Sequence, residues 1–432
     1  MGSLVYNTCM VNFKDKFLNF WKTLGPGLTT GAADDDPSGI ATYSQTGAKY
    51  GFMFAWLAPF TIPLMSVVQE MCARIGIVTK QGLAANIKKH YSKKVLFFCT
   101  ALLLFANTFN IGADLGAMSQ GMQLIFPNWN FAVLVIVFAV LSLAFQVFIP
   151  YKTYSKYLKY LSFVLLAYIF SALMVDMDWK EVFRHTFIPS MSFTKDSFII
   201  LSAILGTTIS PYLFFWQTSQ EVEEEIMTGK IDKVEQEEEI REDIKEMRTD
   251  VWSGMFFSNI VMFFIIIACA STLYKSGITN IGTAADAAKA LEPFAGHFSS
   301  LLFAVGIIGI GFLAIPVLAG ANSYAVSECF DWKEGLYRKW NEAYAFYGVI
   351  VLGVVVGIVL NFVGFDPIKA LIYSAVLNSL VAPVILFFIV RLSSNEEVMG
   401  NFKSRPVAKI IGWIATIVMS LAGIATIISL WM

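Results

Sequence analysis

Residues 25–42 read Gly-Pro-Gly-Leu-Thr-Thr-Gly-Ala-Ala-Asp-Asp-Asp-Pro-Ser-Gly-Ile-Ala-Thr and place three consecutive carboxylates among mostly small or apolar residues. If residues 18–48 cross a membrane, Asp34, Asp35 and Asp36 lie near the middle of that span. An ionised carboxylate at that depth costs several kcal/mol unless it is paired, hydrated or bound to a cation. This stretch therefore needs a compensating positive charge.

A proline follows the three acids directly. Pro37 removes a backbone donor and disfavours helical geometry at Asp36, while Gly31 and Gly39 loosen the chain on either side. The sequence therefore predicts a break in the helix at this point. A broken helix that carries acids is typical of a cation site.

The composition is that of an integral membrane protein. Of the 432 residues, 56% are hydrophobic and 15% are charged, whereas soluble proteins have about 25% charged residues. A spanning helix needs roughly 20 mainly apolar residues, and the mean hydropathy is +0.64. We predict eleven spans: 18–48, 53–75, 95–119, 130–149, 157–176, 197–218, 252–273, 299–325, 341–364, 367–391 and 406–431.

Positive charges collect on alternate connections between these spans. Such connections are typically cytoplasmic, so we expect a plasma-membrane protein with a cytoplasmic N-terminus and an extracellular C-terminus. The fifth-to-sixth connection is an imperfect case, because it holds Lys180, Arg184 and Lys195. The residues on the predicted cytoplasmic side are Lys14, Lys16 and Lys22; Arg74, Lys80, Lys88, Lys89, Lys93 and Lys94; Lys152, Lys156 and Lys159; Lys333, Arg338 and Lys339; and Arg391, Lys403, Arg405 and Lys409.

Residues 221–248 form a strongly charged connection with apolar residues at near-helical spacing. We predict a solvated amphipathic helix, with the alternative that its acids concentrate cations at a cytoplasmic mouth. The five cysteines are scattered and odd in number, so they indicate neither a disulfide framework nor a metal cluster. They are Cys9, Cys72, Cys99, Cys269 and Cys329.

The sixth predicted span contains a second break. Residues 204–217 place Gly206, two threonines, Ser210 and Pro211 in the middle of an apolar segment, five segments after the first break. Matching breaks in two five-helix halves are typical of inverted-repeat transporters, whose substrate site lies near the bilayer midplane. The alternative for Pro211 alone is a simple proline kink.

These residues also carry a resemblance to a known family. Asp36-Pro-Ser-Gly39 is similar to Asp-Pro-Gly-Asn, Asp114-Leu-Gly-Ala117 to Asp-Leu-Ala-Glu, and Thr207-Thr-Ile-Ser-Pro-Tyr212 to Ala-x-x-Met-Pro-His. Residues 69–84 are similar to the end of the family's second helix. Over nearly its whole length the chain resembles the natural resistance-associated macrophage protein (NRAMP) family of divalent-metal transporters.

The resemblance implies an all-α membrane protein of about eleven helices with the LeuT-type 5+5 inverted repeat and broken helices 1 and 6. We expect one transport domain over residues 1–432, with repeats at 12–178 and 194–392 and an additional helix at 405–432.

The resemblance also implies the metal ligands and where they differ. The family's metal-binding aspartate corresponds to Asp36, its asparagine to Gly39, its methionine to Ser210, and the alanine that supplies a carbonyl to Thr207. Oxygen donors suit Mg²⁺ and Mn²⁺, whereas a thioether favours softer metals. The smaller side chains leave room for water, and Mg²⁺ gives up its water reluctantly. In these departures the chain resembles the NRAMP-related magnesium transporter branch more than the proton-coupled manganese and iron branch.

Two further residues complete the expected metal contacts. The family's tenth-helix glutamine aligns with Ala375, and Asn378, one turn away, is the possible substitute. Asp35 is the other additional contact, although neighbours on a helix point about 100° apart, so the three acids can share one ion only if the chain unwinds. Asp114 is expected to be a polar contact or vestibule residue rather than a ligand.

Several residues that carry protons in the family are replaced in this chain. Two histidines of the sixth helix correspond to Tyr212 and Gln217, the third-helix glutamate corresponds to Ala117, and residues 344–363 contain no arginine. The three histidines of the chain fall in or beside predicted connections, where we expect an ordinary surface role; they are His90, His185 and His297.

We therefore expect an importer of Mg²⁺ and Mn²⁺ that works by alternating access without proton coupling. It would be no enzyme, would need no resident cofactor, and would contact divalent cations and the lipid bilayer but no nucleic acid. A monomer is compatible with the sequence, and the oligomeric state stays open.

Four alternatives remain: a proton-coupled Mn²⁺ or Fe²⁺ symporter, a sodium-coupled transporter of an organic substrate, an intramembrane aspartic protease, and a membrane scaffold. The protease lacks support because the chain has no Gly-x-Gly-Asp pattern, and a scaffold gives no reason for buried acids.

Overall fold

The computed structural model describes residues 25–149, 165–231, 236–364 and 366–431, and no strand occurs in these ranges. Eight of the described helices are long and apolar enough to cross a membrane. They are α4 (Leu57–Thr79), α6 (Lys93–Ile125), α7 (Phe131–Phe148), α11 with α12 (Lys195–Thr208 and Pro211–Met227), α13 (Glu237–Cys269, continued by η2 Ala270–Tyr274), α16 (Ser299–Phe330), α18 (Pro367–Ser393) and α20 (Pro406–Trp431).

The other predicted spans correspond to shorter helices. The first span consists of two half-helices, α2 (Pro26–Asp34) and α3 (Pro37–Tyr50), and the ninth is α17 (Tyr344–Leu360). Of the fifth span only α9 (Leu166–Met174) lies in the described residues. The predicted all-α membrane fold is therefore confirmed.

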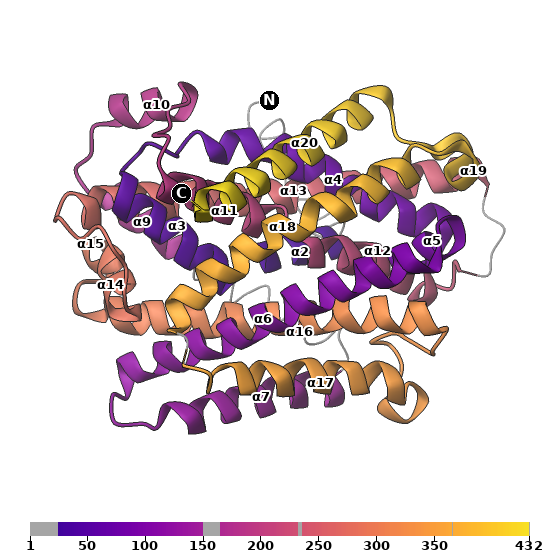
Figure 1. Cartoon of the computed structure of the whole chain (residues 1–432), viewed down its shortest axis with the longest axis horizontal. Coiled ribbons are helices and arrows are strands. Elements are labelled where there is room, and N and C mark those ends of the chain that lie inside the picture. Colours follow the sequence, from indigo (N-terminus) through magenta and orange to yellow (C-terminus); the bar gives the residue numbers. More distant parts are fainter. Residues whose placement is uncertain (1–24, 150–164, 232–235, 365, 432) are drawn as a thin grey trace, which may run out of the picture.

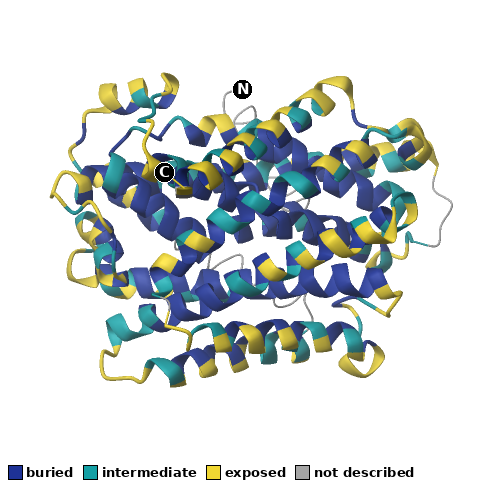
Figure 2. Cartoon of the chain, in the orientation of Figure 1, coloured by how far each residue is buried: buried dark blue, intermediate teal, exposed yellow. Residues whose placement is uncertain are grey.

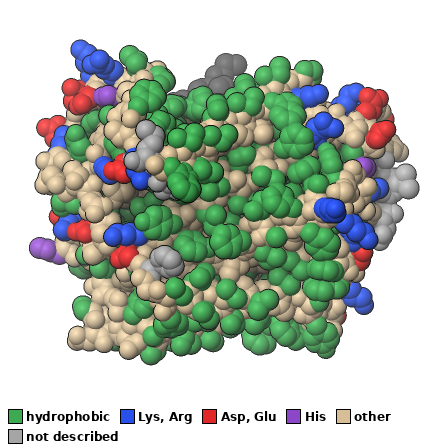
Figure 3. Space-filling model, in the orientation of Figure 1, with side chains coloured by type: hydrophobic (Ala, Val, Ile, Leu, Met, Phe, Trp, Pro, Cys, Tyr) green, Lys and Arg blue, Asp and Glu red, His purple; other side chains and the backbone are tan. Residues whose placement is uncertain are grey.

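The long helices run side by side along the longest axis of the molecule (Figure 1). Hydrophobic side chains cover the middle of the face in Figure 3, and charged side chains gather towards its two ends. Phe105, Leu352, Val359 and Leu421 are among the exposed apolar side chains. An exposed apolar belt between charged ends suits a lipid bilayer. The buried residues lie mostly on the inner helices of the bundle (Figure 2).

The short connecting helices separate into two groups at opposite ends of the molecule (Figure 1). At one end lie α5 (Leu83–His90) and α19 (Glu396–Met399), in two of the connections that are rich in Lys and Arg. At the other end lie α10 (Trp179–Phe187), α14 (Ala284–Ala288) and α15 (Glu292–Ala295). The two Lys- and Arg-rich connections that hold α5 and α19 therefore lie at the same end of the molecule. Residues 14–22 and 152–159 of the prediction lie outside the described residues.

Both predicted helix breaks are present and have the same local cause. Asp36 is extended (φ −62°, ψ 173°) and precedes Pro37, the first residue of α3. Ser210 is likewise extended (φ −83°, ψ 132°) and precedes Pro211, the first residue of α12. Proline suits the first position of a helix because its nitrogen needs no partner there, so each proline ends one half-helix and starts the next.

Glycines bring the backbones of α2 and α13 into direct contact. A Cβ added at Gly31 would lie 2.4 Å from the carbonyl carbon and oxygen of Gly254, and a Cβ added at Gly27 would lie 2.6 Å from the nitrogen of Val251. Such approaches are possible only for glycine. We call these residues (Gly27, Gly31, Val251 and Gly254) the α2–α13 seam.

Helix α2 takes its N-terminal cap from a distant residue. Its own N-cap position is Gly25, which has no side chain to accept a hydrogen bond. Instead, Gly27 and Leu28 donate their backbone N–H groups to the carboxylate of Asp250 on α13, over 2.6 and 3.0 Å. An anion suits a helix N-terminus because it satisfies free N–H groups and interacts favourably with the helix dipole.

The prediction of a solvated amphipathic helix at 221–248 is wrong for its first part. Helix α12 continues to Met227 as part of the bundle, so Glu221, Glu223 and Glu225 are buried. Glu223 accepts hydrogen bonds from the Tyr324 hydroxyl and, over 2.5 Å, from the Leu336 N–H. The second part is helical with exposed acids at 237–239, but it is continuous with the seventh span.

The described cysteines are buried, and the three histidines lie in or beside the connections, as predicted for the histidines. The four described cysteines, Cys72, Cys99, Cys269 and Cys329, are buried and free, and Cys9 lies outside the described residues. His90 ends α5, His185 lies in α10, and His297 is exposed in the connection before α16. These histidines are partly or fully exposed and lie in the end groups of short elements.

Candidate functional site

The two helix breaks contact each other in the interior. The Ser38 hydroxyl lies 3.2 Å from the Thr207 hydroxyl, and the Tyr43 hydroxyl lies 3.2 Å from that of Thr208. The Tyr212 hydroxyl, one residue past the second proline, donates to the Ala33 carbonyl over 3.0 Å. Residues almost 170 positions apart in the sequence thus form one polar region between the half-helices.

Asp36 is the carboxylate at the centre of this region. One oxygen (Oδ1) accepts hydrogen bonds from the Ser38 hydroxyl at 2.5 Å and the Gly39 N–H at 2.9 Å. The other (Oδ2) accepts from the Asn110 amide at 2.9 Å and the Tyr212 hydroxyl at 3.4 Å. The side chain is only 1% exposed, and none of the ion pairs among the described residues includes it. Hydrogen bonds alone hold this carboxylate in place.

Asn110 is a site residue that the sequence reasoning missed. It lies on α6, donates to Asp36, and accepts a hydrogen bond from the Ser374 hydroxyl of α18 over 2.7 Å. An ionised carboxylate can only accept, so the amide nitrogen faces Asp36 and the amide oxygen faces Ser374, whose hydroxyl also lies 2.7 Å from the Leu371 carbonyl. The signal was present in the third span, where Asn107, Asn110 and Asp114 share one helical face in an apolar segment.

The other predicted contacts of the main site line the same region. Ser210 uses its hydroxyl hydrogen on the Gly206 and Thr207 carbonyls, at 2.8 and 2.7 Å, and keeps its oxygen lone pairs. A Cβ added at Gly39 would lie 3.2 Å from the Thr207 hydroxyl and 3.3 Å from the Tyr43 ring. In this conformation, neighbouring side chains fill the space that Gly39 leaves.

Asn378 and Asp114 lie close to this region in the helices that supply Ser374 and Asn110. Asn378 is one helical turn after Ser374, and Asp114 is one turn after Asn110, so each shares a helix face with a residue of the Asp36 network. Both side chains are fully buried. Neither amide atom of Asn378 and neither carboxylate oxygen of Asp114 has a hydrogen-bond partner among the described residues.

The first two acids of the stretch point elsewhere. Asp34 and Asp35 are fully buried, and both accept from the Ser258 hydroxyl of α13, at 2.6 and 3.2 Å. The structure therefore brings Asp36, Gly39, Thr207 and Ser210 together and turns Asp35 towards α13.

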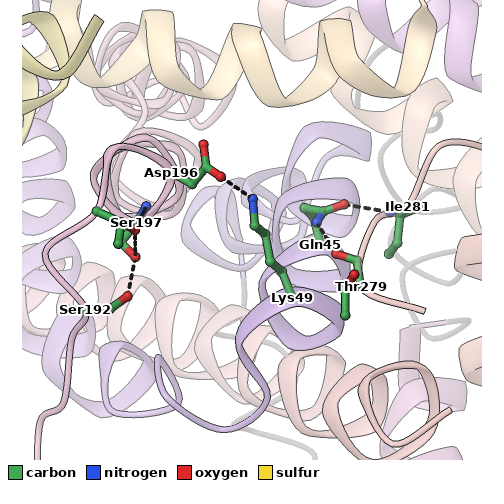
Figure 4. Close-up of polar contacts among 8 residues, drawn as sticks. Gln45, Lys49, Ser192, Asp196, Ser197, Thr279 and Ile281 are labelled. Carbon is green, nitrogen blue, oxygen red and sulfur yellow. Dashed lines mark hydrogen bonds and ion pairs between the residues drawn. The ribbon is translucent and has the colours of Figure 1, made fainter. Parts of the chain in front are cut away.

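The end of the site towards α10 and α14 is closed by contacts around α3 (Figure 4). The buried Gln45 amide accepts from the Ile281 N–H at 2.8 Å and donates to the Thr279 carbonyl at 3.1 Å. Lys49 pairs with Asp196 at the start of α11 over 2.6 Å. Because both charged side chains are substantially exposed, this ion pair contributes little stability.

The opposite end is closed by a chain of polar contacts. The Thr30 hydroxyl of α2 donates to the Gln217 carbonyl oxygen of α12 over 2.5 Å, and the Gln217 amide donates to Glu221 over 2.7 Å. Thr30, Gln217 and Glu221 are all buried. The site is thus closed on both sides in this conformation.

Comparison with known sequences and structures shows that this chain is similar to transport proteins. The sequence model of the family described as "Nramp: Natural resistance-associated macrophage protein-like" matches residues 27–429. The chain is 27% identical over 421 residues to the divalent metal cation transporter MntH of Caldanaerobacter subterraneus subsp. tengcongensis, covering 95% of this chain and 94% of that protein. It is 24% identical over 410 residues to the protein of the same name from Deinococcus radiodurans, covering 93% and 88%.

Solved structures with a similar fold include the Eremococcus coleocola manganese transporter in complex with an aromatic bis-isothiourea substituted compound. Its TM-score is 0.77 at 19% identity, covering 95% of this chain and 88% of that one. Mhp1, a nucleobase-cation-symport-1 family transporter in a closed conformation, has a TM-score of 0.55 at 15% identity, covering 94% and 91%. These likenesses confirm the predicted LeuT-type architecture.

Proposed function

We propose, from the premise that this chain belongs to the natural resistance-associated macrophage protein-like (Nramp) family, that it transports divalent metal cations by alternating access between the two helix breaks. Members of this family are transporters, and the expectation that the chain is no enzyme is confirmed. The observation that carries the proposal is Asp36, a buried carboxylate at the point where both breaks meet, with no cationic side-chain partner among the described residues.

The cargo that we propose is Mg²⁺ and Mn²⁺. The side chains that donate to Asp36 do so through oxygen and nitrogen. The Thr207 hydroxyl contacts that of Ser38, and the Ser210 hydroxyl contacts the Thr207 carbonyl, so the second break adds oxygen atoms to this region. Hard oxygen donors suit these two ions. The closed packing around Gly39 means that the breaks must separate before an ion that keeps several waters can enter.

The proposed transport proceeds without proton coupling and in the inward direction. The partners of Asp36 are hydroxyl, amide and backbone N–H groups, and the three histidines lie in the short end elements. A negative cytoplasmic potential drives a cation inwards by about 2.3 kcal/mol per charge per 100 mV. For inward transport into the cell, the protein would lie in the plasma membrane with its N-terminus in the cytoplasm. Residues 12–178 and 194–392 would form the two repeats that move relative to each other.

The test is ion uptake by the purified chain in liposomes that contain a divalent-cation dye and a pH dye. We expect uptake of Mg²⁺ and Mn²⁺, faster with a negative interior potential, with no acidification of the interior. Mn²⁺ uptake accompanied by acidification would establish the proton-coupled alternative. A requirement for Na⁺ would favour the organic-substrate alternative, and an absence of divalent cation uptake would refute the proposal.

Replacing Asn110 by alanine is expected to raise the KM for Mn²⁺ uptake by about 10- to 100-fold, the range seen when groups that orient metal ligands are removed. The variant loses the donor to Asp36 and the acceptor of Ser374. The measurement is initial uptake rate against Mn²⁺ concentration. Asn107→Ala is the matched control, because that amide donates to Asn322 instead of Asp36; equal KM values for the two variants would contradict the role of Asn110.

A further inference from the structure

Asp34 and Asp35 form a second buried pair of acids, on the α13 side of the break. The Ser258 hydroxyl is the donor common to both, over 2.6 Å to Asp34 and 3.2 Å to Asp35. A serine hydroxyl has one hydrogen, so it cannot fully satisfy two carboxylates at once. The remaining oxygens, Asp34 Oδ1 and Asp35 Oδ2, have no hydrogen-bond partner among the described residues.

This pair is distinct from the site at Asp36. The Asp36 carboxylate accepts from donors on α3, α6 and α12, including Asn110 and Tyr212, whereas Asp34 and Asp35 face α13. Asp36 thus has three donors of its own and a share of the Tyr212 hydroxyl hydrogen, which also reaches the Ala33 carbonyl, whereas among the described residues one hydroxyl donates to both Asp34 and Asp35.

Two fully buried carboxylates need more compensation than one hydroxyl provides. Both side chains have 0% exposure, and neither takes part in an ion pair among the described residues. A buried charge without a partner is costly enough that it must be paired, protonated or bound to a metal. Two carboxylates and a hydroxyl oxygen offer hard oxygen ligands and two negative charges, which match a divalent ion.

We propose that Asp34, Asp35 and Ser258 form a second seat for a hard divalent cation, beside and separate from the seat at Asp36. This inference rests on the proposed function for the class of ion. It adds that each chain binds two such ions, one at Asp36 and one at the Asp34 and Asp35 pair. Asp35, an additional contact of the first site in the sequence prediction, belongs to this second seat.

The test is the number of Mn²⁺ ions bound per chain, measured by equilibrium dialysis and by the electron paramagnetic resonance signal of free Mn²⁺. The native chain is expected to bind two ions. The double variant Asp34→Asn with Asp35→Asn, which keeps the size of both side chains, is expected to bind one ion, and Ser258→Ala is expected to weaken the second ion by about 10-fold, in line with the loss of one good contact.

Asp250→Asn is the matched control, because that buried acid already accepts two backbone N–H groups from α2 and should not bind an ion. Thermal melting of each variant shows whether it is folded. If the native chain binds one Mn²⁺ and still transports it, the second seat is refuted, the proposed function stands, and a proton shared by the two acids explains their burial. If the native chain binds and transports no divalent ion, the proposed function fails.

Discussion

Replacing Asp36 by alanine should reduce Mg²⁺ and Mn²⁺ uptake by roughly 100- to 4,000-fold. Removing one partner of a buried charge pair costs about 3–5 kcal/mol, and each 1.4 kcal/mol is a tenfold change. The carboxylate accepts hydrogen bonds from both sides of the site, namely from Asn110 on α6 and Tyr212 on α12. The uptake assay in liposomes measures the effect directly.

The alanine variant also loses a structural role, so a second variant is needed. Asp36 is the N-cap of α3 and accepts from the Gly39 N–H, and replacing an N-cap by alanine costs about 0.5–2 kcal/mol. Asp36→Asn keeps an N-cap side chain and removes only the charge, and it should lose uptake to the same extent. Asp196→Asn, in the exposed pair with Lys49, is the control for losing a carboxylate. Uptake at the native rate by Asp36→Ala would disprove the assigned role.

Replacing Gly31 by alanine should lower the melting temperature of the protein and abolish most of its transport. The added Cβ would lie 2.4 Å from the carbonyl carbon and oxygen of Gly254, and these are backbone atoms that cannot rotate away. Overpacking typically costs about 1–3 kcal/mol, which exceeds the gain of about 1 kcal/mol that alanine brings to a helix. Helix α2 must shift away from α13, and its C-terminal end carries the acids of the break.

The matched control for Gly31→Ala is Gly348→Ala in α17. That glycine is also helical, but nothing lies within 4 Å of a Cβ built on it. It should therefore keep or raise the melting temperature and leave uptake unchanged. Identical melting temperatures and uptake rates for the two variants would show that the α2–α13 seam tolerates a side chain.

The sequence alone was enough to predict both breaks and the spanning helices that lie in the described residues. Apolar length determines a membrane span, and proline has the same local effect wherever it occurs, so Pro37 and Pro211 each start a half-helix as predicted. The prediction that the two breaks lie together rested on their matching positions in the two halves, and the contact between Ser38 and Thr207 agrees with it.

Partners from distant helices could not be predicted in the same way. The hydrogen bonds from Asn110 to Asp36 and from Ser258 to Asp34 depend on which helix faces which neighbour, and local patterns do not contain that information. The burial of Glu223 was missed for the same reason, because its partners Tyr324 and Leu336 come from about 100 residues later. From the sequence alone, a charged residue near a helix end is predicted to be solvated, because the distant residue that binds it in the fold is not known.

The cap that Asp250 gives to α2 has a consequence for how the protein can move. The two N–H groups of Gly27 and Leu28 donate to a carboxylate on α13, so α2 cannot separate from α13 without breaking both bonds. Hydrogen bonds to charged groups contribute about 1.5–3 kcal/mol each, so separation would be slower by about 100-fold or more. Helices α2 and α13 should therefore move as one rigid body during transport. The interface that rearranges should lie between this pair and the helices packed around it.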